Sequence, residues 1–135
     1  MTTTLSEVLT PHGVEIPAHL EAQMEVPCLH ALQRQGDVMI APMRRGKVEG
    51  LEPVPSEGIA VVRGEAGGNT HLLVADGAVS YARKEAGQTI GSLVVEDGAA
   101  AYLIHPEHGA TGIAPGSYRV SRQRQQAEEI RQVAD

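Results

Sequence analysis

The sequence predicts a small all-β domain, mainly antiparallel. We expect a small β-barrel or a jelly-roll-like β-sandwich, with short peripheral helices at the N- and C-termini. First, short apolar runs recur along the chain with glycine- and proline-containing turns between them, which is the rhythm of sandwiches and barrels. Second, no long stretch of helical periodicity separates these runs, which argues against a doubly wound α/β sheet.

Length and composition indicate one domain with a modest core. The chain has 135 residues, which are enough for one domain and few for two. It contains no Phe or Trp, so the core has to be built from aliphatic side chains, which bury less apolar area than aromatic ones. A self-associating surface would add buried area, and we therefore expect a homo-oligomer or a complex with a protein partner.

Charge and cysteine content restrict the partners and the compartment. A formal net charge of −6 argues against non-specific binding to nucleic acid or to an anionic membrane. The single cysteine, Cys28, cannot form an internal disulfide, and the N-terminus lacks the basic and apolar regions of a signal peptide. No apolar run has the length of a transmembrane helix. We expect a cytoplasmic protein with no membrane partner.

Residues 1–33 are interpreted as a peripheral segment. Apolar residues between 5 and 9 have helical spacing after a Thr/Ser start, which predicts a short helix, and a second short helix is expected over 18–24. Cys28 and His30 are two residues apart, as metal ligands can be. The simpler interpretation is a small buried thiol beside a surface histidine.

Residues 34–124 form the predicted β domain. Gly36-Asp37 indicates a turn before a strand over 38–41, which Pro42 is expected to stop. Residues 43–57 have the composition of an irregular arm, and the next strand is expected over 59–62.

Two Asp-Gly pairs predict hairpins in the second half of the domain. Asp76-Gly77 and Asp97-Gly98 each lie between two apolar runs, and this is the strongest short-range hairpin signal. The two units also resemble each other, as a degenerate internal repeat or a β-meander would.

The last part of the chain is expected to hold one more strand and a terminal helix. Tyr118, Val120 and Arg122 alternate with Arg119 and Ser121, which predicts a half-buried strand. Residues 125–135 carry apolar residues at helical spacing, so we expect a short C-terminal helix or a tail.

One stretch concentrates side chains that handle metals and protons, Ile104-His105-Pro106-Glu107-His108-Gly109. Pro106 suits the second position of a type I turn, and such a turn brings its end Cα atoms within about 7 Å. Both imidazoles could then reach one ion at about 2.0–2.1 Å. His71 begins a predicted strand and is the third candidate ligand. We expect His71, His105 and His108 to bind a divalent metal such as zinc.

Two classes of function fit these residues. The favoured hypothesis is a non-enzymatic β-rich binding or assembly module that carries the histidine metal site. The alternative is a metal-dependent enzyme or metal sensor whose architecture resembles that of cupins, with Glu107 as general base. The first cupin motif needs two histidines one residue apart, and here only His71 is present. Without a metal, His105 and His108 decorate a solvated turn and His71 caps a strand.

Nucleic-acid binding is a third, less favoured hypothesis. Its support is a group of basic residues beside Tyr118, namely Arg119, Arg122 and Arg124.

Five motifs occur in order within residues 33–135: QGDV, GxxH, HPEHG, PGxYRV and QR. This pattern resembles that of a group of small uncharacterised bacterial proteins. In that group Gly-His-x-His stands where this chain has Gly68-Asn69-Thr70-His71, so Asn69 replaces one candidate ligand. The resemblance implies the positions of a site and no particular activity.

Overall fold

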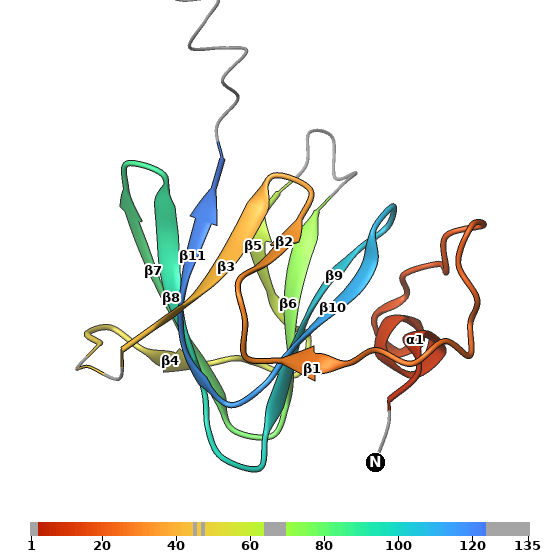
Figure 1. The fold of residues 1–135 in the computed structure, drawn as a ribbon, viewed down its shortest axis with the longest axis horizontal. Coiled ribbons are helices and arrows are strands. Elements are labelled where there is room, and N and C mark those ends of the chain that lie inside the picture. The colour runs from red at the N-terminus through yellow and green to blue at the C-terminus, as the bar shows by residue number, and fades with distance from the viewer. Residues whose placement is uncertain (1–2, 45, 47, 64–69, 124–135) are drawn as a thin grey trace, which may run out of the picture.

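Two β-sheets form the layers of a sandwich in the computed structural model, which describes residues 3–44, 46, 48–63 and 70–123 (Figure 1). The five-stranded sheet consists, in spatial order, of β1 (Cys28–Leu29), β10 (Gly109–Ile113), β9 (Ala100–His105), β6 (His71–Asp76) and β5 (Ile59–Val62). The six-stranded sheet consists of β2 (Gln33–Gln35), β3 (Val38–Met43), β11 (Gly116–Arg122), β8 (Thr89–Val95), β7 (Val79–Ala86) and β4 (Glu52–Pro53).

The predicted all-β class is confirmed, and the described strands adopt the sandwich alternative. Neighbouring strands pair antiparallel in both sheets, except for β1 and β10, which are parallel. The arm predicted to be irregular contributes the short strand β4, which pairs with β7. Residues 64–69 and the predicted C-terminal helix or tail at 125–135 lie outside the described residues.

The predicted Asp-Gly hairpins are wrong, because the chain changes sheets at both Asp-Gly pairs. Gly77 and Gly98 have the positive φ expected of such turns, 98° and 82°. However, β6 pairs with β9 and β7 pairs with β8, so the four strands form one long hairpin bent over both layers. Leu73 before the first turn and Val79 after it enter the same core from opposite sheets. A local turn signal cannot distinguish that arrangement from two strands of one sheet.

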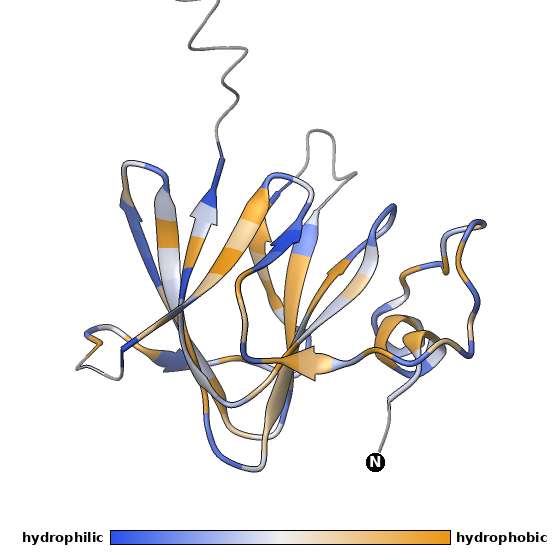
Figure 2. Cartoon of the chain, in the orientation of Figure 1, coloured by the Kyte–Doolittle hydropathy of each residue, from blue (hydrophilic) through white to orange (hydrophobic). Residues whose placement is uncertain are grey.

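Alternate residues of the strands fill the space between the sheets, where Figure 2 shows apolar segments in orange. Leu73 and Leu103 from one sheet meet Leu93 and Val120 from the other, and each of these side chains is at most 2% exposed. Aliphatic residues dominate this core, as the composition predicts, and Tyr81 and Tyr118 add aromatic volume to it.

The N-terminal segment covers the outer face of the five-stranded sheet. Helix α1 (Leu5–Leu9) begins with a capping box between Thr4 and Glu7 and is followed by the 3₁₀ turn η1 (Thr10–His12). Its apolar residues pack on the outward-facing residues of β6 and β9, namely Val74, Tyr102 and Ile104. Neither of these helical segments, nor any other helix in the described ranges, is long and apolar enough to cross a bilayer.

Two predicted elements differ from the observed ones. The helix expected over 18–24 is a series of turns closed by backbone hydrogen bonds from Leu20 to Pro17 and from Met24 to Glu21, and the carbonyls of Ala22 and Met24 accept from the N–H groups of Ser6 and Leu5. The strand expected to stop at Pro42 continues to Met43. Proline lacks the N–H group that a strand in the middle of a sheet donates to its neighbour. β2 pairs only with residues 38–40 of β3, so Pro42 has no partner strand on the β2 side and no hydrogen bond is lost there.

We predict that Gly91→Ala destabilises the fold by about 1–3 kcal/mol through overpacking. A Cβ at Gly91 would lie 2.7 Å from the Ala82 carbonyl oxygen and against the Tyr81 hydroxyl. Urea denaturation measures the loss. Gly46→Ala is the matched control, since the nearest atom to its Cβ is the Arg44 carbonyl oxygen at 3.8 Å. Equal stability of the two variants would contradict the prediction.

Candidate histidine site

His71 and His105 lie side by side because of the register between β6 and β9. That ladder pairs Leu72 with Ile104, so the next residues, His71 and His105, end it together. Both imidazoles belong to the inward-facing set of their strands and are 3% and 4% exposed. Their ring centroids are 4.4 Å apart. The strand order therefore brings His71 to the turn that carries the other two histidines.

His108 joins this pair from the turn between β9 and β10. His105 pairs with Gly109, which leaves residues 106–108 as the turn. The exposed ring of His108 lies 4.6 Å from that of His105 and 6.4 Å from that of His71. The backbone N–H of Glu107 donates to His105 Nδ1 at 3.0 Å, so Nδ1 is an acceptor there. Glu107 itself is exposed.

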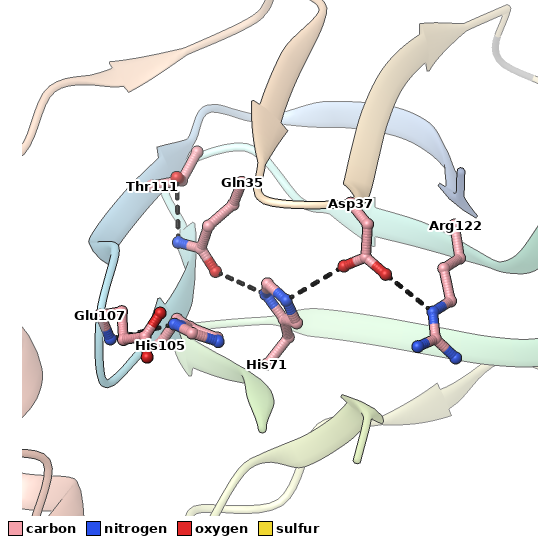
Figure 3. A network of polar contacts seen from close by, with 7 residues as sticks. All are labelled: Gln35, Asp37, His71, His105, Glu107, Thr111 and Arg122. Atoms are coloured by element: carbon pink, nitrogen blue, oxygen red, sulfur yellow. Dashed lines mark hydrogen bonds and ion pairs between the residues drawn. The ribbon is translucent and has the colours of Figure 1, made fainter. Parts of the chain in front are cut away.

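Gln35 determines which nitrogen of His71 carries the proton (Figure 3). The side chain is 3% exposed, and its Nε2 donates to the Leu103 carbonyl oxygen at 2.8 Å and to Thr111 Oγ1 at 3.1 Å. Its Oε1 therefore faces His71 Nδ1, at 2.9 Å. An amide oxygen only accepts, so Nδ1 is protonated and a neutral His71 has its lone pair on Nε2.

That lone pair faces Asp37, which extends the chain of contacts to Arg122. His71 Nε2 and Asp37 Oδ1 are 3.5 Å apart, and Asp37 Oδ2 accepts from Arg122 Nε at 2.9 Å. Asp37 stands in the two-residue turn between β2 and β3. The turn lies so close to the histidines that a Cβ on Gly36 would be 3.2 Å from His108 Nε2.

The environment keeps His71 neutral and Asp37 ionised. The pKa of His71 is lowered to about 4, mainly by burial and by the neighbouring His105 and to a smaller extent by His108 and Arg122. The charge of Asp37 acts in the opposite direction. Burial raises the pKa of Asp37, but the hydrogen bond and charge of Arg122 more than offset this and the pKa lies below its ordinary value. At neutral pH the 3.5 Å contact is thus between a lone pair and a carboxylate, not an ion pair.

The described residues do not already surround a common point as metal ligands do. No group of three or more His, Cys, Asp or Glu within those ranges has such an arrangement. Cys28 and His30 make separate contacts: the Cys28 thiol donates to the Tyr102 hydroxyl oxygen at 3.5 Å, and His30 lies against the Tyr118 ring at 5.5 Å. Cys28 is also exposed, contrary to the expected buried thiol.

Two of the three basic residues considered for nucleic acid lie in the described part of the chain. Arg119 is exposed, whereas Arg122 is held by Asp37, and Arg124 lies outside the described residues. The alternation expected along this strand is observed from Tyr118 to Val120, which are buried on either side of the exposed Arg119, and it ends at a bulge between Val120 and Ser121.

Sequence reasoning missed Gln35, Asp37 and Thr111 as parts of the site. A signal for Asp37 was available, because Gly36-Asp37 indicates a turn, and Gln35 is the strand residue directly before that turn. Nothing local to Thr111 indicates that it contacts a side chain from β2.

We predict that stability falls between pH 6.5 and pH 4 because of His71. The pKa of His71 is lowered in the folded chain from 6.5 to about 4, so in this window the unfolded chain binds a proton that the folded chain does not. The free energy of unfolding should fall by about 3 kcal/mol as the pH is lowered through it. Denaturation at several pH values measures the slope.

His71→Gln should flatten this slope, whereas His19→Gln, at an exposed position in the N-terminal segment, should leave it unchanged. An unaltered slope in His71→Gln would show that other groups cause the pH dependence.

Comparison with known proteins identifies a family for most of the domain. The profile described as "Domain of unknown function (DUF8820)" matches residues 34–123. Comparisons with curated proteins and with solved structures gave no significant match. The matched segment includes every residue of the site from Gln35 to Arg122, and it supports the predicted relation to an uncharacterised group. The chain belongs to the DUF8820 family.

Proposed function

We propose that this protein is a non-enzymatic β-sandwich module that binds a divalent metal cation, preferably zinc, at the histidine cluster. The observation that carries the proposal is the 3.5 Å approach of His71 Nε2 to Asp37 Oδ1. Both atoms could lie about 2.0–2.2 Å from one zinc ion, with an angle near that of tetrahedral coordination. A cation between them would replace a repulsive contact with an attractive one. We further infer a cytoplasmic location, as the single cysteine indicates.

The other two histidines support this proposal by their closeness. The His105 and His108 rings lie 4.4 Å and 6.4 Å from that of His71. His108 is exposed on a turn, so its side chain can rotate toward the buried pair at small cost. Coordination by His108 requires such a rotation, and coordination by His105 requires that its Nδ1 release the Glu107 N–H or that its Nε2 lose its proton. We expect metal binding to order His108.

Binding is favoured over catalysis by the position of Glu107. The cupin-like alternative needs its carboxylate as a general base within hydrogen-bond reach of a substrate proton. Here Glu107 is exposed and contacts His105 through its backbone N–H. His71, in contrast, is oriented by Gln35 through the ring nitrogen that points away from Asp37, as second-shell partners orient metal-binding histidines.

We predict that metal-stripped protein binds one zinc ion per chain in isothermal titration calorimetry. His71→Gln and Asp37→Asn should each weaken binding at least about tenfold, since each removes one proposed ligand. His30→Gln is the control, because His30 lies against Tyr118 and outside the cluster. The absence of stoichiometric zinc, or equal weakening by His30→Gln, would exclude the metal site.

We also propose that the module assembles with a second copy of itself. The large apolar residues exposed in the described structure are Met24, Leu29 and Leu32, at 41%, 46% and 65%. Met24 precedes β1, Leu29 lies in it and Leu32 directly precedes β2. These two strands follow one another in the chain and are outermost strands of the two sheets. Outermost strands have unpaired backbone groups, so a second chain can pair there and cover the leucines.

We predict a concentration-dependent dimer in size-exclusion chromatography with light scattering. The double variant Leu29→Ser, Leu32→Ser should shift it to monomer, because it removes the apolar area without altering the core. A wild-type chain that stays monomeric at high concentration would refute self-assembly and leave the metal proposal unaffected.

A further inference from the structure

A cleft of about 570 Å³ opens between β5 and the six-stranded sheet, and none of its described lining residues is a histidine. Residues 58–63 form one side, and Arg83, Ile90 and Arg122 from β7, β8 and β11 line the other. A second cavity of about 270 Å³ shares Glu85, Ile90 and Arg122 with it and extends along the β7–β8 turn. The volume is in the usual range of small-molecule sites, about 300–1,000 Å³.

The cleft is positively charged although the protein is acidic overall. The described lining residues include three arginines, Arg63, Arg83 and Arg122, and one carboxylate, Glu85. Asp37 pairs with Arg122 from outside the lining, so the positive groups outnumber the negative ones here, whereas the chain as a whole has a formal net charge of −6. Glu85 lies 3.9 Å from Arg83, but their side chains are 73% and 47% exposed, so water screens this pair strongly. The cleft therefore presents an excess of cationic groups to an anion.

Two of these arginines are held in place by the fold. Arg83 on β7 donates from Nη2 to the Ala60 carbonyl oxygen on β5 at 2.6 Å, across the gap between the sheets. Arg122 is held by Asp37 through Nε. A guanidinium that is already ordered loses little freedom on binding, and its planar set of donors matches a carboxylate or phosphate group.

The cleft also offers apolar surface next to the charges. Ile59 and Ile90 are only partly buried and pack against the core from opposite sides of the cleft. A ligand that fits both features has an anionic head and a short apolar body.

We propose that this cleft binds a small organic anion of that kind, a carboxylate or a phosphate monoester. Arg63, Arg83 and Arg122 take the anionic head, and Ile59 and Ile90 take the apolar body. This site is separate from the metal site. The two meet at Arg122, so its substitution would disturb both, and the test uses Arg63 and Arg83 instead.

Hexanoate, hexyl phosphate and hexanol are the probes, titrated into the full chain by calorimetry and by ¹H–¹⁵N NMR. At least one of the two anions should bind, with shifts concentrated at residues 58–63 and around Arg83, Ile90 and Arg122. The stronger of the two identifies the head group. Hexanol has the same apolar body and should bind at least about tenfold more weakly, because it lacks the charge-assisted hydrogen bonds.

Arg63→Gln should weaken anion binding several-fold, and Arg83→Lys should also weaken it, since lysine keeps the charge but lacks the planar donor set. Lys84→Gln is the matched control: it removes the same charge at the neighbouring exposed position on β7, which does not line the cleft. Failure of both anions to bind, equal binding of hexanol, shifts elsewhere, or equal weakening by Lys84→Gln would each overturn the proposal. None of these outcomes bears on zinc binding.

Discussion

The hydrogen bond from His71 Nδ1 to Gln35 Oε1 determines the chemistry of the site. It connects a strand of each sheet, and it is one-directional because the amide N–H groups of Gln35 are used by Leu103 and Thr111. The lone pair of His71 must then point at Asp37. Burial opposes protonation of that lone pair, so the site keeps an unprotonated nitrogen facing a carboxylate. Exchange of Gln35 for a residue that donates to His71 would reverse the tautomer and remove this arrangement.

The bent hairpin formed by β6, β7, β8 and β9 explains how the fold delivers the histidines. β6 pairs with β9 along its length, starting next to the Asp-Gly turns. Because one face of each strand is buried, the core residues along the strands determine their register. A shift of β6 by one residue would move Leu73 out of the core and His71 out of the site together, and the same shift of β9 would do so for Leu103 and His105. The same strand register therefore determines the packing of the core and places His71 beside His105.

The sequence predicted much of this, and its failures have a common cause. Alternating apolar residues gave the strands, and the Pro106–Gly109 turn indicated where His105 and His108 would lie. The sequence could not show that Asp76-Gly77 joins two sheets, because both kinds of turn use positive φ and apolar flanks. Nor could it show the contact of Gln35 with Leu103, since that depends on which strands oppose each other across the sandwich. Local patterns specify elements, whereas partners across layers depend on topology.

Arg122 gives the proposed cation and anion sites a physical reason to influence each other. Its positive charge is one of the causes that lower the pKa of His71, so the same field disfavours a metal cation beside His71. An anion in the cleft would offset that charge and weaken its effect at the histidines. By linkage, a cation at His71 must then strengthen anion binding by the same factor. The Asp37–Arg122 hydrogen bond, at 2.9 Å, places the two sites next to each other, and because both side chains are more than a third exposed, water reduces the size of this coupling.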